Sequence, residues 1–437
     1  MVGKALLKRI APPKQLAGEI TTPGDKSISH RAIILNSLAS GRSKIRNLSS
    51  GRDCRSTINC LRALGVQFER QEEEPLSLFI HGVGNNGLTE ARNVLNAGNS
   101  GTTMRLLSGV LATQPFLSII TGDASLRSRP MKRLVEPLRL MGAEIYGRDA
   151  DSLAPLVIKG KKLHGITYLL PVPSAQLKSA IMLASLYSEG NTIIEQPQPS
   201  RDHTERLLKQ MGVKFKSDNT HVVLTPLTNP LIPVDLHIPG DISSAAYWLV
   251  AGAIHPNAQI RITNCGINPT RTGIIDVLLA MGAKLKVENQ HLEGNEPVAD
   301  LYIESSQLKA IEINREIIPR LIDEIPALAV AACVAKGNTV IRDAGELRVK
   351  ESDRILTTVR ELSRLGAKIE ELPDGMIIHG NSSLRGTAVK SHSDHRLTMS
   401  LAIASLVAKG ETVIHGAQAA EISYPDFWKE LERLAKY

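Results

Sequence analysis

The sequence predicts an α/β protein of two domains, each built from three copies of one repeated unit. Three signals recur in phase along its 437 residues. A polar or glycine-rich tetrad runs into about a dozen apolar, helix-periodic residues, a short β-branched strand follows, and a second helix ends at a glycine before the next strand. Neighbouring tetrads begin about 65 to 85 residues apart, a spacing longer than that of solenoid repeats, which favours closed three-fold assemblies. The tetrads begin at Gly24, Gly98, Pro173, Pro239, Asp323 and Ser393.

Each unit is expected to contain a helix, a strand, a second helix and one or more strands. Glycine just past an apolar run caps a helix C-terminus, and β-branched alternation after it indicates a strand. We expect such strands at 40–45, 190–194, 337–341 and 410–414, with weaker forms at 114–120 and 257–262. The second helices end in a pattern close to LxxLG[AV], whose copies begin at Leu61, Leu138, Leu207, Leu278, Leu362 and Leu431.

Two stretches rich in proline and glycine, at 22–24 and 229–240, mark the expected domain boundaries. We expect one domain over 23–238 and a discontinuous domain over 1–22 and 239–437. The N-terminal strand, 16–21, precedes the first unit and is therefore placed with the second half. The chain would then cross between the domains twice, at a hinge.

Composition narrows the function. The sequence is 42% hydrophobic and 22% charged, which is typical of a globular protein. No apolar run reaches the ~18 residues of a membrane span, and no signal-peptide pattern is present, so we expect a cytoplasmic protein without a membrane partner. The four cysteines lack disulfide or zinc spacing. A formal charge of +8 without a Lys/Arg block, and only 3% aromatic residues, favour anionic metabolites over nucleic acid.

The polar tetrads are candidate anion sites, because free backbone N–H groups and the positive end of the dipole meet at a helix start. Lys26 and Ser27 lie in the first turn of the first helix, and Arg31 follows on the same face. Two cations and a hydroxyl there predict a phosphate or carboxylate site. Residues 98–103 lack the lysine of a P-loop but allow close approach of backbone to a ligand. Each motif alone also fits an ordinary capped helix.

Arginines and carboxylates recur where the second helices begin. Arg129 is held extended by the proline after it, and Arg201 occupies the equivalent place in the next unit. Residues 347–354 fill the same place with several charges, and Asp323 opens the helix upstream. A carboxylate beside lysine and arginine is how a general acid or base is tuned. Exposed surface arginines and a solvated charge run are the alternatives.

The sixth and fourth tetrads differ in charge. Asp394, His395 and Arg396 stand at the sixth start, where the arginine would bind a carboxylate or phosphate and the histidine could be a plain cap residue. The fourth start, 239–241, offers no charge-matching group and is interpreted as a hinge rather than a site. Histidine spacing typical of a metal site is absent from the sequence.

Six motifs together resemble the 5-enolpyruvylshikimate-3-phosphate synthases, and the resemblance covers nearly the whole chain. In order and spacing they are GDKSISHR, AGNSGTTMR, LRSRPM, PSAQLKSA, RVKESDR and SDHR. The resemblance implies a two-domain inside-out α/β barrel of three βαβαββ units per domain, closing over phosphoenolpyruvate and shikimate 3-phosphate. It implies transfer of the enolpyruvyl (carboxyvinyl) group to the 5-hydroxyl of shikimate 3-phosphate, with release of phosphate, in the shikimate pathway of aromatic amino-acid biosynthesis. It further implies a monomer that needs no metal or redox cofactor.

The resemblance also implies roles for individual residues. Asp323 would be the base for the 5-hydroxyl, and Glu351 and Lys26 would be the proton-transfer partners at the phosphoenolpyruvate methylene. The implied substrate-binding residues are Lys26, Ser27, Arg31, Asn99, Gly101, Thr102, Arg129, Ser174, Ala175, Gln176, Arg201, Asp323, Lys350, Arg354, His395 and Arg396.

Some positions depart from part of the family. Glu346 stands where some relatives carry asparagine, Ala175 replaces a common serine, and Ser423 stands where some relatives carry lysine. These choices resemble the class II bacterial group, which is often tolerant of glyphosate. Gly101 keeps the small residue associated with sensitivity. We therefore expect glyphosate to compete with phosphoenolpyruvate.

Two other functions remain open at this point. The related transferases that act on UDP-N-acetylglucosamine use a cysteine in a loop, and none of the four cysteines stands in a suitable glycine-rich loop. A repeat protein that binds RNA or other polyanions without catalysis is suggested only by the sequence pI near 9.2.

Overall fold

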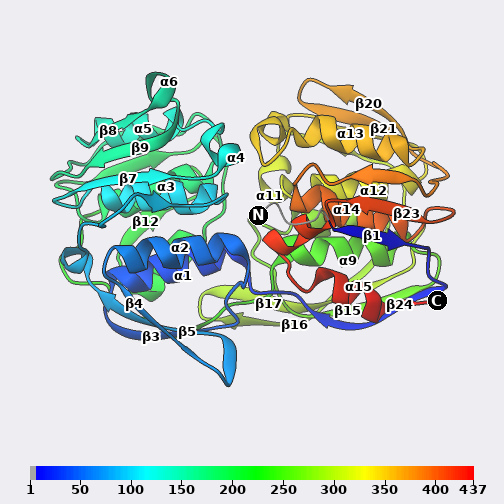
Figure 1. The fold of residues 1–437 in the computed structure, drawn as a ribbon, viewed down its shortest axis with the longest axis horizontal. Helices are drawn as coiled ribbons and strands as arrows, with labels where there is room; N and C mark the ends of the chain where they lie inside the picture. Colours follow the sequence, from blue (N-terminus) through cyan, green and yellow to red (C-terminus); the bar gives the residue numbers. More distant parts are fainter. Residues whose placement is uncertain (1–5) are drawn as a thin grey trace. The chain divides into compact units, whose positions relative to one another are not determined.

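The computed structural model describes residues 6–437, which divide into two compact units (Figure 1). The N-terminal unit comprises Gly24–Ile238 with Glu293–Glu296. The C-terminal unit comprises the described residues up to Pro23, together with Pro239–Leu292 and Pro297–Tyr437. Each unit has its own hydrophobic core. Among the described residues, no helix is both long and apolar enough to cross a membrane.

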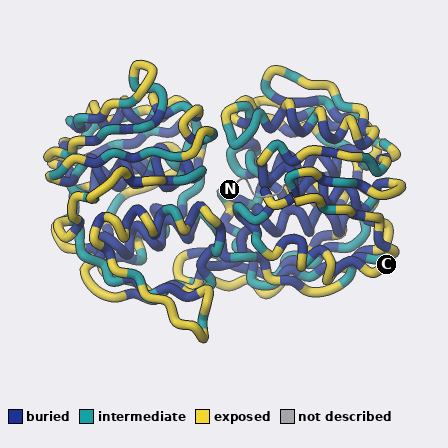
Figure 2. Tube along the Cα trace, viewed as in Figure 1, coloured by how far each residue is buried: buried dark blue, intermediate teal, exposed yellow. Residues whose placement is uncertain are grey.

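Each polar tetrad leads into a mostly buried helix, as the sequence predicts (Figure 2). At five of the six starts, an Asp or Ser side chain accepts a backbone N–H from two or three residues further on, which caps the helix. The helices are α1 (Lys26–Leu38), α3 (Gly101–Leu111), α7 (Ala175–Ser185), α9 (Ile242–Ile254), α12 (Ile325–Val334) and α14 (His395–Ser405).

The fifth start differs from the prediction. A short helix, α11 (Ile318–Leu321), comes first, and Asp323 lies between it and α12 instead of opening the helix. Glu324 occupies the N-cap position, but its side chain makes no cap. The Glu324 carboxylate instead accepts a hydrogen bond from Ser243, which lies 81 residues earlier in the chain.

The second helices and the shorter helical segments connect the strands. The second helix of each repeat follows its first strand, as predicted, and they are α2 (Arg52–Ala63), α5 (Lys132–Leu140), α8 (His203–Gln210), α10 (Gly273–Ala280), α13 (Arg354–Arg364) and α15 (Phe427–Leu434). The shorter segments are α4 (Ala124–Arg127), α6 (Arg148–Asp151), η1 (Asn85–Gly87), η2 (Gly345–Val349) and η3 (Ala417–Ile422).

In the described part of the N-terminal unit, the strands form three four-stranded sheets. The first, in spatial order, is β14 (Leu236–His237), β3 (Ser40–Arg46), β5 (Glu74–Val83) and β4 (Gln67–Gln71). The second is β6 (Leu95–Asn96), β7 (Leu117–Thr121), β9 (Leu153–Lys159) and β8 (Glu144–Gly147). The third is β10 (Thr167–Leu169), β11 (Thr192–Glu195), β13 (His221–Leu224) and β12 (Phe215–Ser217).

The C-terminal unit repeats this plan with sheets of five, four and three strands among its described residues. The first is β16 (Lys284–Glu293), β17 (Glu296–Glu304), β15 (Ala258–Gly266), β2 (Gln15–Thr21) and β24 (Ala435–Lys436). The second is β18 (Glu312–Ile313), β19 (Asn338–Ile341), β21 (Gly375–His379) and β20 (Lys368–Leu372). The third is β1 (Leu7–Ile10), β23 (Thr412–His415) and β22 (Ala388–Lys390).

Every sheet contains one parallel pair, and in four sheets that pair flanks a buried helix, as in β6–α3–β7. In the other two sheets, the first strand comes from a distant part of the chain. Strand β14 lies beside β3, and β2 lies parallel to β15. The register of β2 with β15 places the N-terminal strand in a sheet of the C-terminal unit.

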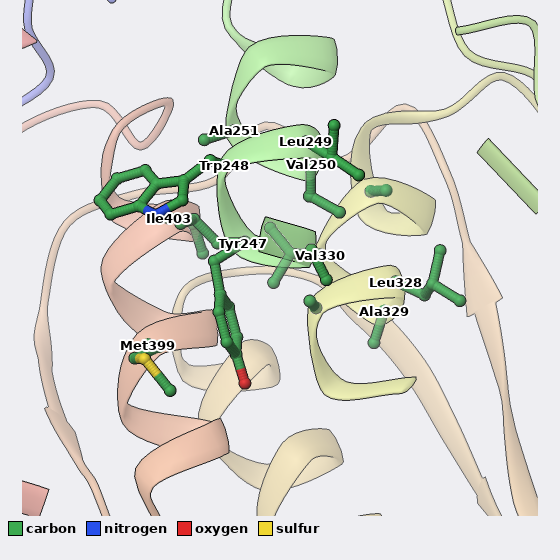
Figure 3. Close-up of a cluster of buried hydrophobic side chains, with 14 of the residues drawn as sticks. Tyr247, Trp248, Leu249, Val250, Ala251, Leu328, Ala329, Val330, Met399 and Ile403 are labelled. Carbon is green, nitrogen blue, oxygen red and sulfur yellow. The ribbon is translucent and has the colours of Figure 1, made fainter. Parts of the chain in front are cut away.

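The buried helices lie inside each unit and the sheets lie outside them. In the C-terminal unit, α9, α12 and α14 pack against one another. Figure 3 shows Tyr247 and Trp248 of α9 with Val330 of α12 and Met399 and Ile403 of α14 in this core. Because these helices are buried on nearly all sides, their polar starts are the places where the helical core can present chemistry at a surface.

Candidate active site

The N-terminal unit holds Lys26 at the start of α1, as predicted. Its ammonium lies 3.1 Å from Asp53 Oδ2, and both side chains are largely buried. Asp53 is the second residue of α2, so two neighbouring helix starts bring this cation and carboxylate together. A lysine held in this way is fixed in position while it remains within reach of an anionic ligand.

Arg31, one turn further along α1, is held on three sides. Its Nε donates to Thr204 Oγ1 at 2.6 Å, its Nη2 to Ser179 Oγ at 2.8 Å, and its Nη1 to the carbonyl of Ser27 at 2.9 Å. Burial lowers the pKa of Arg31 to about 10, with Glu205 opposing that shift. That pKa is still far above neutral, so the guanidinium is a cation at pH 7.

The glycine-rich start of α3 meets the start of α7. Thr102 Oγ1 accepts a hydrogen bond from Gln176 Nε2 at 2.9 Å, and Gln176 Oε1 accepts one from Arg105 Nη1 at 2.7 Å. A Cβ on Gly101 would lie 2.7 Å from Arg105 Nη1 and 3.6 Å from Arg129 Nη1. A larger residue at position 101 would therefore require the guanidinium of Arg105 to shift.

Arg129 extends from the segment before α5 to the same glycine-rich loop. Its Nη2 donates to Asn99 Oδ1 and, at 3.2 Å, to Ser125 Oγ. Asn99 in turn donates to Asp123 at 2.7 Å. Although Arg129 is largely buried, its partners come from both neighbouring segments, which is how a residue at a ligand site is positioned.

In the C-terminal unit, one guanidinium gathers three carboxylates. Arg354, at the first position of α13, places Nε 2.8 Å from Asp394 Oδ2 and Nη1 3.2 Å from Asp323 Oδ1, and its Nη2 donates to Glu351. The Arg354 side chain is 1% exposed. Burial alone would lower its pKa, but Asp394, Glu351 and Asp323 raise it above its usual value.

Arg396 and Lys350 complete this cluster. Arg396 Nη2 lies 3.8 Å from Asp323 Oδ2, and Nη1 lies 3.9 Å from Glu324 Oε1. Burial removes water from the ammonium group of Lys350 and so lowers the pKa of Lys350, although Asp323 opposes that shift. Carboxylates in contact with several cations on the surface of a helical core are an arrangement suited to proton transfer.

The remaining predicted residues lie at the same helix starts. Ser174 caps α7 by accepting the Leu177 N–H, and Ala175 is the first residue of that helix. Arg201 lies near enough to Arg31 to lower its pKa. His395 is buried in the first turn of α14.

The fourth start has no cation in its own tetrad, as the sequence indicates, but the fold brings an arginine to it. Asp241 caps α9 and lies 3.4 Å from Arg271 Nη2. The same Arg271 nitrogen donates to Ser243 Oγ at 2.6 Å. Arg271 lies 30 residues after Asp241 in the sequence, and inspection of the tetrad alone does not reveal it.

Asp53 and Arg271 could have been found from the repeat itself. Both stand where a second helix begins, the same place that drew attention to Arg129, Arg201 and 347–354. Extending that comparison to the first and fourth repeats points to them. Arg105 carries no such signal, because its role depends on the side-by-side packing of α3 and α7.

Fold and site together define a two-unit α/β enzyme for anionic substrates. The N-terminal unit carries a cluster of cations at its helix starts, and the C-terminal unit carries a carboxylate–arginine cluster. A family model described as EPSP synthase (3-phosphoshikimate 1-carboxyvinyltransferase) matches residues 10–431. The chain belongs to the EPSP synthase family.

Individual relatives agree over their full lengths. The 3-phosphoshikimate 1-carboxyvinyltransferase of Gloeobacter violaceus is 54% identical over 97% of this chain and 98% of its own. That of Herpetosiphon aurantiacus is 51% identical with the same coverage. An EPSP synthase structure from Acinetobacter baumannii has a TM-score of 0.87 at 42% identity, covering 99% of this chain and 98% of that one.

The enolpyruvyl transferase NikO from Streptomyces tendae shares the fold, with a TM-score of 0.78 at 20% identity over 99% of this chain and 98% of its own. These similarities, with the strand order above, confirm the predicted two-domain inside-out α/β architecture.

Proposed function

We propose that this chain transfers the carboxyvinyl group of phosphoenolpyruvate to the 5-hydroxyl of shikimate 3-phosphate and releases phosphate. The observation that carries the proposal is the pairing of Asp323 and Glu351 on the single guanidinium of Arg354. Two carboxylates with separate roles are what a proton-transfer pair requires. The family match over 10–431 and the full-length relatives supply the identity of the substrates.

The reaction can be written with these groups. Glu351, with Lys26, delivers a proton to the methylene carbon of phosphoenolpyruvate, which leaves a cationic centre at C2. Asp323 takes the proton of the 5-hydroxyl as its oxygen adds to C2, giving a tetrahedral intermediate. Glu351, with Lys26, then takes a proton back from the new methyl group as phosphate departs, which restores the double bond and the acid. General acid–base assistance of this kind typically contributes about 10²–10⁴-fold in rate.

The remaining residues bind and orient the two anions. Lys26, Ser27 and Arg31, with Ser174, Ala175, Gln176 and Arg201, are proposed to bind shikimate 3-phosphate. This part of the proposal is supported by the fixed guanidinium of Arg31 and by the capped start of α7.

The residues proposed for phosphoenolpyruvate are Gly101, Arg129, Arg354 and Arg396, together with Lys26, which is proposed to contact both substrates. Asn99, Thr102, Lys350 and His395 are proposed as further substrate-binding residues. Positioning of reactants is worth more than any single acid or base, because it converts a meeting of two molecules into a unimolecular step.

The test is phosphate release from phosphoenolpyruvate with each candidate acceptor. We expect turnover with shikimate 3-phosphate and none with UDP-N-acetylglucosamine. Turnover with the sugar nucleotide alone would overturn the proposal. All four cysteines are buried free thiols, and burial raises the pKa of Cys60 and of Cys333 to about 12, which disfavours a thiol acid.

Several finer expectations remain predictions: competition by glyphosate, a monomeric state, a cytoplasmic location and class II character. Glyphosate should raise the apparent KM for phosphoenolpyruvate without changing kcat. Inhibition that does not depend on phosphoenolpyruvate concentration would contradict this. Light scattering on the protein as it elutes from a size-exclusion column would measure its molar mass and so test the monomeric state.

A further inference from the structure

A buried polar network adjoins the carboxylate–arginine cluster of the C-terminal unit through Glu324. Ser243 Oγ accepts from Arg271 Nη2 at 2.6 Å and donates to Glu324 Oε1. Arg271 Nη2 lies 4.0 Å from the same Glu324 oxygen and 3.4 Å from Asp241 Oδ1, so it is shared between two carboxylates. The Arg271 side chain is 3% exposed and that of Glu324 is fully buried. These three side chains come from the segment before α10, the first turn of α9 and the start of α12.

Glu324 connects this network to the reacting groups. Its Oε1 lies 3.9 Å from Arg396 Nη1, while Arg396 Nη2 lies 3.8 Å from Asp323 Oδ2. Two adjacent carboxylates therefore share one guanidinium, and neither is at direct hydrogen-bonding distance from it. The position of Arg396 depends on how strongly each carboxylate attracts it and on its side-chain hydrogen bond with Tyr247.

We propose that Arg271 and Ser243 are positioning residues that hold Glu324 and balance its charge, so that Arg396 stays between Glu324 and Asp323. This inference rests on the function proposed above, in which Asp323 is the base and Arg396 binds phosphoenolpyruvate. Arg271 and Ser243 act only through Glu324 and Arg396.

The charges make the balance necessary. A fully buried carboxylate attracts whichever cation is nearest, because little water is present to solvate it. With Arg271 in place, part of that attraction is met by Arg271. Without Arg271, Glu324 draws Arg396 toward itself, away from the substrate carboxylate. Without the charge of Glu324, Arg396 pairs more closely with Asp323 and competes with the 5-hydroxyl for the base.

The two substitutions should therefore affect different kinetic constants. For Arg271→Met we expect the KM for phosphoenolpyruvate to rise about tenfold, with a much smaller change in kcat. For Glu324→Gln, which keeps the shape and the hydrogen bond to Ser243, we expect kcat to fall about tenfold with a smaller change in that KM. The KM for shikimate 3-phosphate should stay within about twofold in both.

A conservative variant and a matched control separate positioning from folding. Arg271→Lys keeps the charge and should recover most of the KM lost in Arg271→Met. The matched control is Arg261→Met. Arg261 belongs to the same unit and pairs with Asp300 of β17 at 2.9 Å, so its loss should leave kcat and the KM for phosphoenolpyruvate unchanged. Thermal unfolding of each purified variant by circular dichroism gives the folded fraction at the assay temperature.

Steady-state kinetics on the full chain, with both substrates varied, decides the matter. Opposite splits between KM and kcat in the two variants, with recovery in Arg271→Lys, support the proposal. Two outcomes would overturn it. One is a fall in kcat alone that matches the loss of folded protein, and the other is an Arg271→Met variant with the same kcat and KM as Arg261→Met. Absence of turnover in the wild-type protein would instead refute the proposed function.

Discussion

The guanidinium of Arg354 lies at the centre of the carboxylate–arginine cluster. It contacts Asp323, Glu351 and Asp394 and is almost completely buried. A guanidinium has five N–H donors in a fixed plane. Four of these donors bind the three carboxylates, and the contacts therefore set the direction of both proposed proton-transfer groups.

Substitution of the two proposed proton-transfer groups tests their roles directly. Asp323→Asn and Glu351→Gln keep the side-chain shapes but remove the carboxylates, so each should lower kcat by about 10²–10⁴-fold. Both side chains are only 15% exposed and pair with Arg354. The thermal unfolding midpoint should be measured alongside, because loss of one ion-pair partner also affects stability.

Glu371→Gln is the control, because that carboxylate pairs with Arg348 at 2.9 Å at a partly exposed position of the same unit. It should retain wild-type kcat. Near-normal rates in both Asp323→Asn and Glu351→Gln would contradict the assigned roles.

Gly101→Ala tests the packing of cations around the glycine-rich loop. Its Cβ would approach Arg105 Nη1 to 2.7 Å, so that guanidinium must move and its hydrogen bond to Gln176 must weaken. We expect the KM for phosphoenolpyruvate to rise about tenfold, because a displacement of this size at a binding residue costs 10–100-fold.

Gly345→Ala gives the comparison, since its nearest contact would be an ordinary 3.9 Å from Asp374 Cβ. It should leave the KM for phosphoenolpyruvate unchanged. An equal rise in both variants would show that the Gly101 effect is not local.

At the scale of elements, the helix starts combine two functions. The side chain that caps each helix also fixes the first turn, where the proposed ligand groups stand. Asp394 is the clearest case. It accepts the N–H groups of Arg396 and Leu397 while it also binds the side chain of Arg354. One carboxylate thus connects the starts of α13 and α14 in the carboxylate–arginine cluster.

Asp394→Asn separates these functions, because asparagine caps a helix as well as aspartate but carries no charge. It leaves Arg354 buried with one fewer counter-charge, so we expect a loss of about 3–5 kcal/mol in the free energy of unfolding. Asp353→Asn, at the N-cap of α13 and in a partly exposed pair with Arg348, should lose only about 0–1 kcal/mol. Urea denaturation of both variants provides the comparison.

The same residue predicts a pH dependence. Burial alone would raise the pKa of Asp394, but Arg354 lowers it below its usual value. The carboxylate therefore stabilises the fold fully above its unfolded pKa of about 3.9, and that contribution is lost as pH falls through the lower folded pKa. The stability gap between wild type and Asp394→Asn should be constant near pH 6 and shrink below about pH 4. A gap that widens on acidification would rule out this account.

The elements were predictable from local chemistry, whereas several partners were not. Capping residues before apolar runs and glycines after them are local signals, and they located the helix starts and most of the strands. The fifth start escaped this logic because Glu324 is held by Ser243 instead of capping its own helix. The contacts of Arg271, Arg105 and Thr204 depend on which helices pack together. Spacing along the chain does not contain that information.

At the scale of the whole molecule, the proposed binding residues are divided between two units with separate cores. The residues proposed for shikimate 3-phosphate lie chiefly in the N-terminal unit, on α1 and α7. The proposed base and the arginines that surround it lie in the C-terminal unit, at the starts of α12, α13 and α14. Each group of binding residues therefore belongs to a unit with its own core. The effect of a ligand on backbone protection can then be measured for each unit separately.

Hydrogen exchange of the full chain with one ligand at a time tests this division. Shikimate 3-phosphate alone should protect backbone amides in the first turns of α1 and α7, because those amides and the fixed Arg31 form its proposed site. Adding glyphosate to that complex should extend protection to the starts of α13 and α14. At a ligand concentration of about 100 Kd, binding stabilises the folded state by about 2.7 kcal/mol, which is enough to detect. The first turn of α15 carries no proposed site residue and serves as an internal reference that neither ligand should affect. Protection by shikimate 3-phosphate confined to the C-terminal unit would contradict the proposed division, because the phosphate-binding residues would then lie on the wrong core.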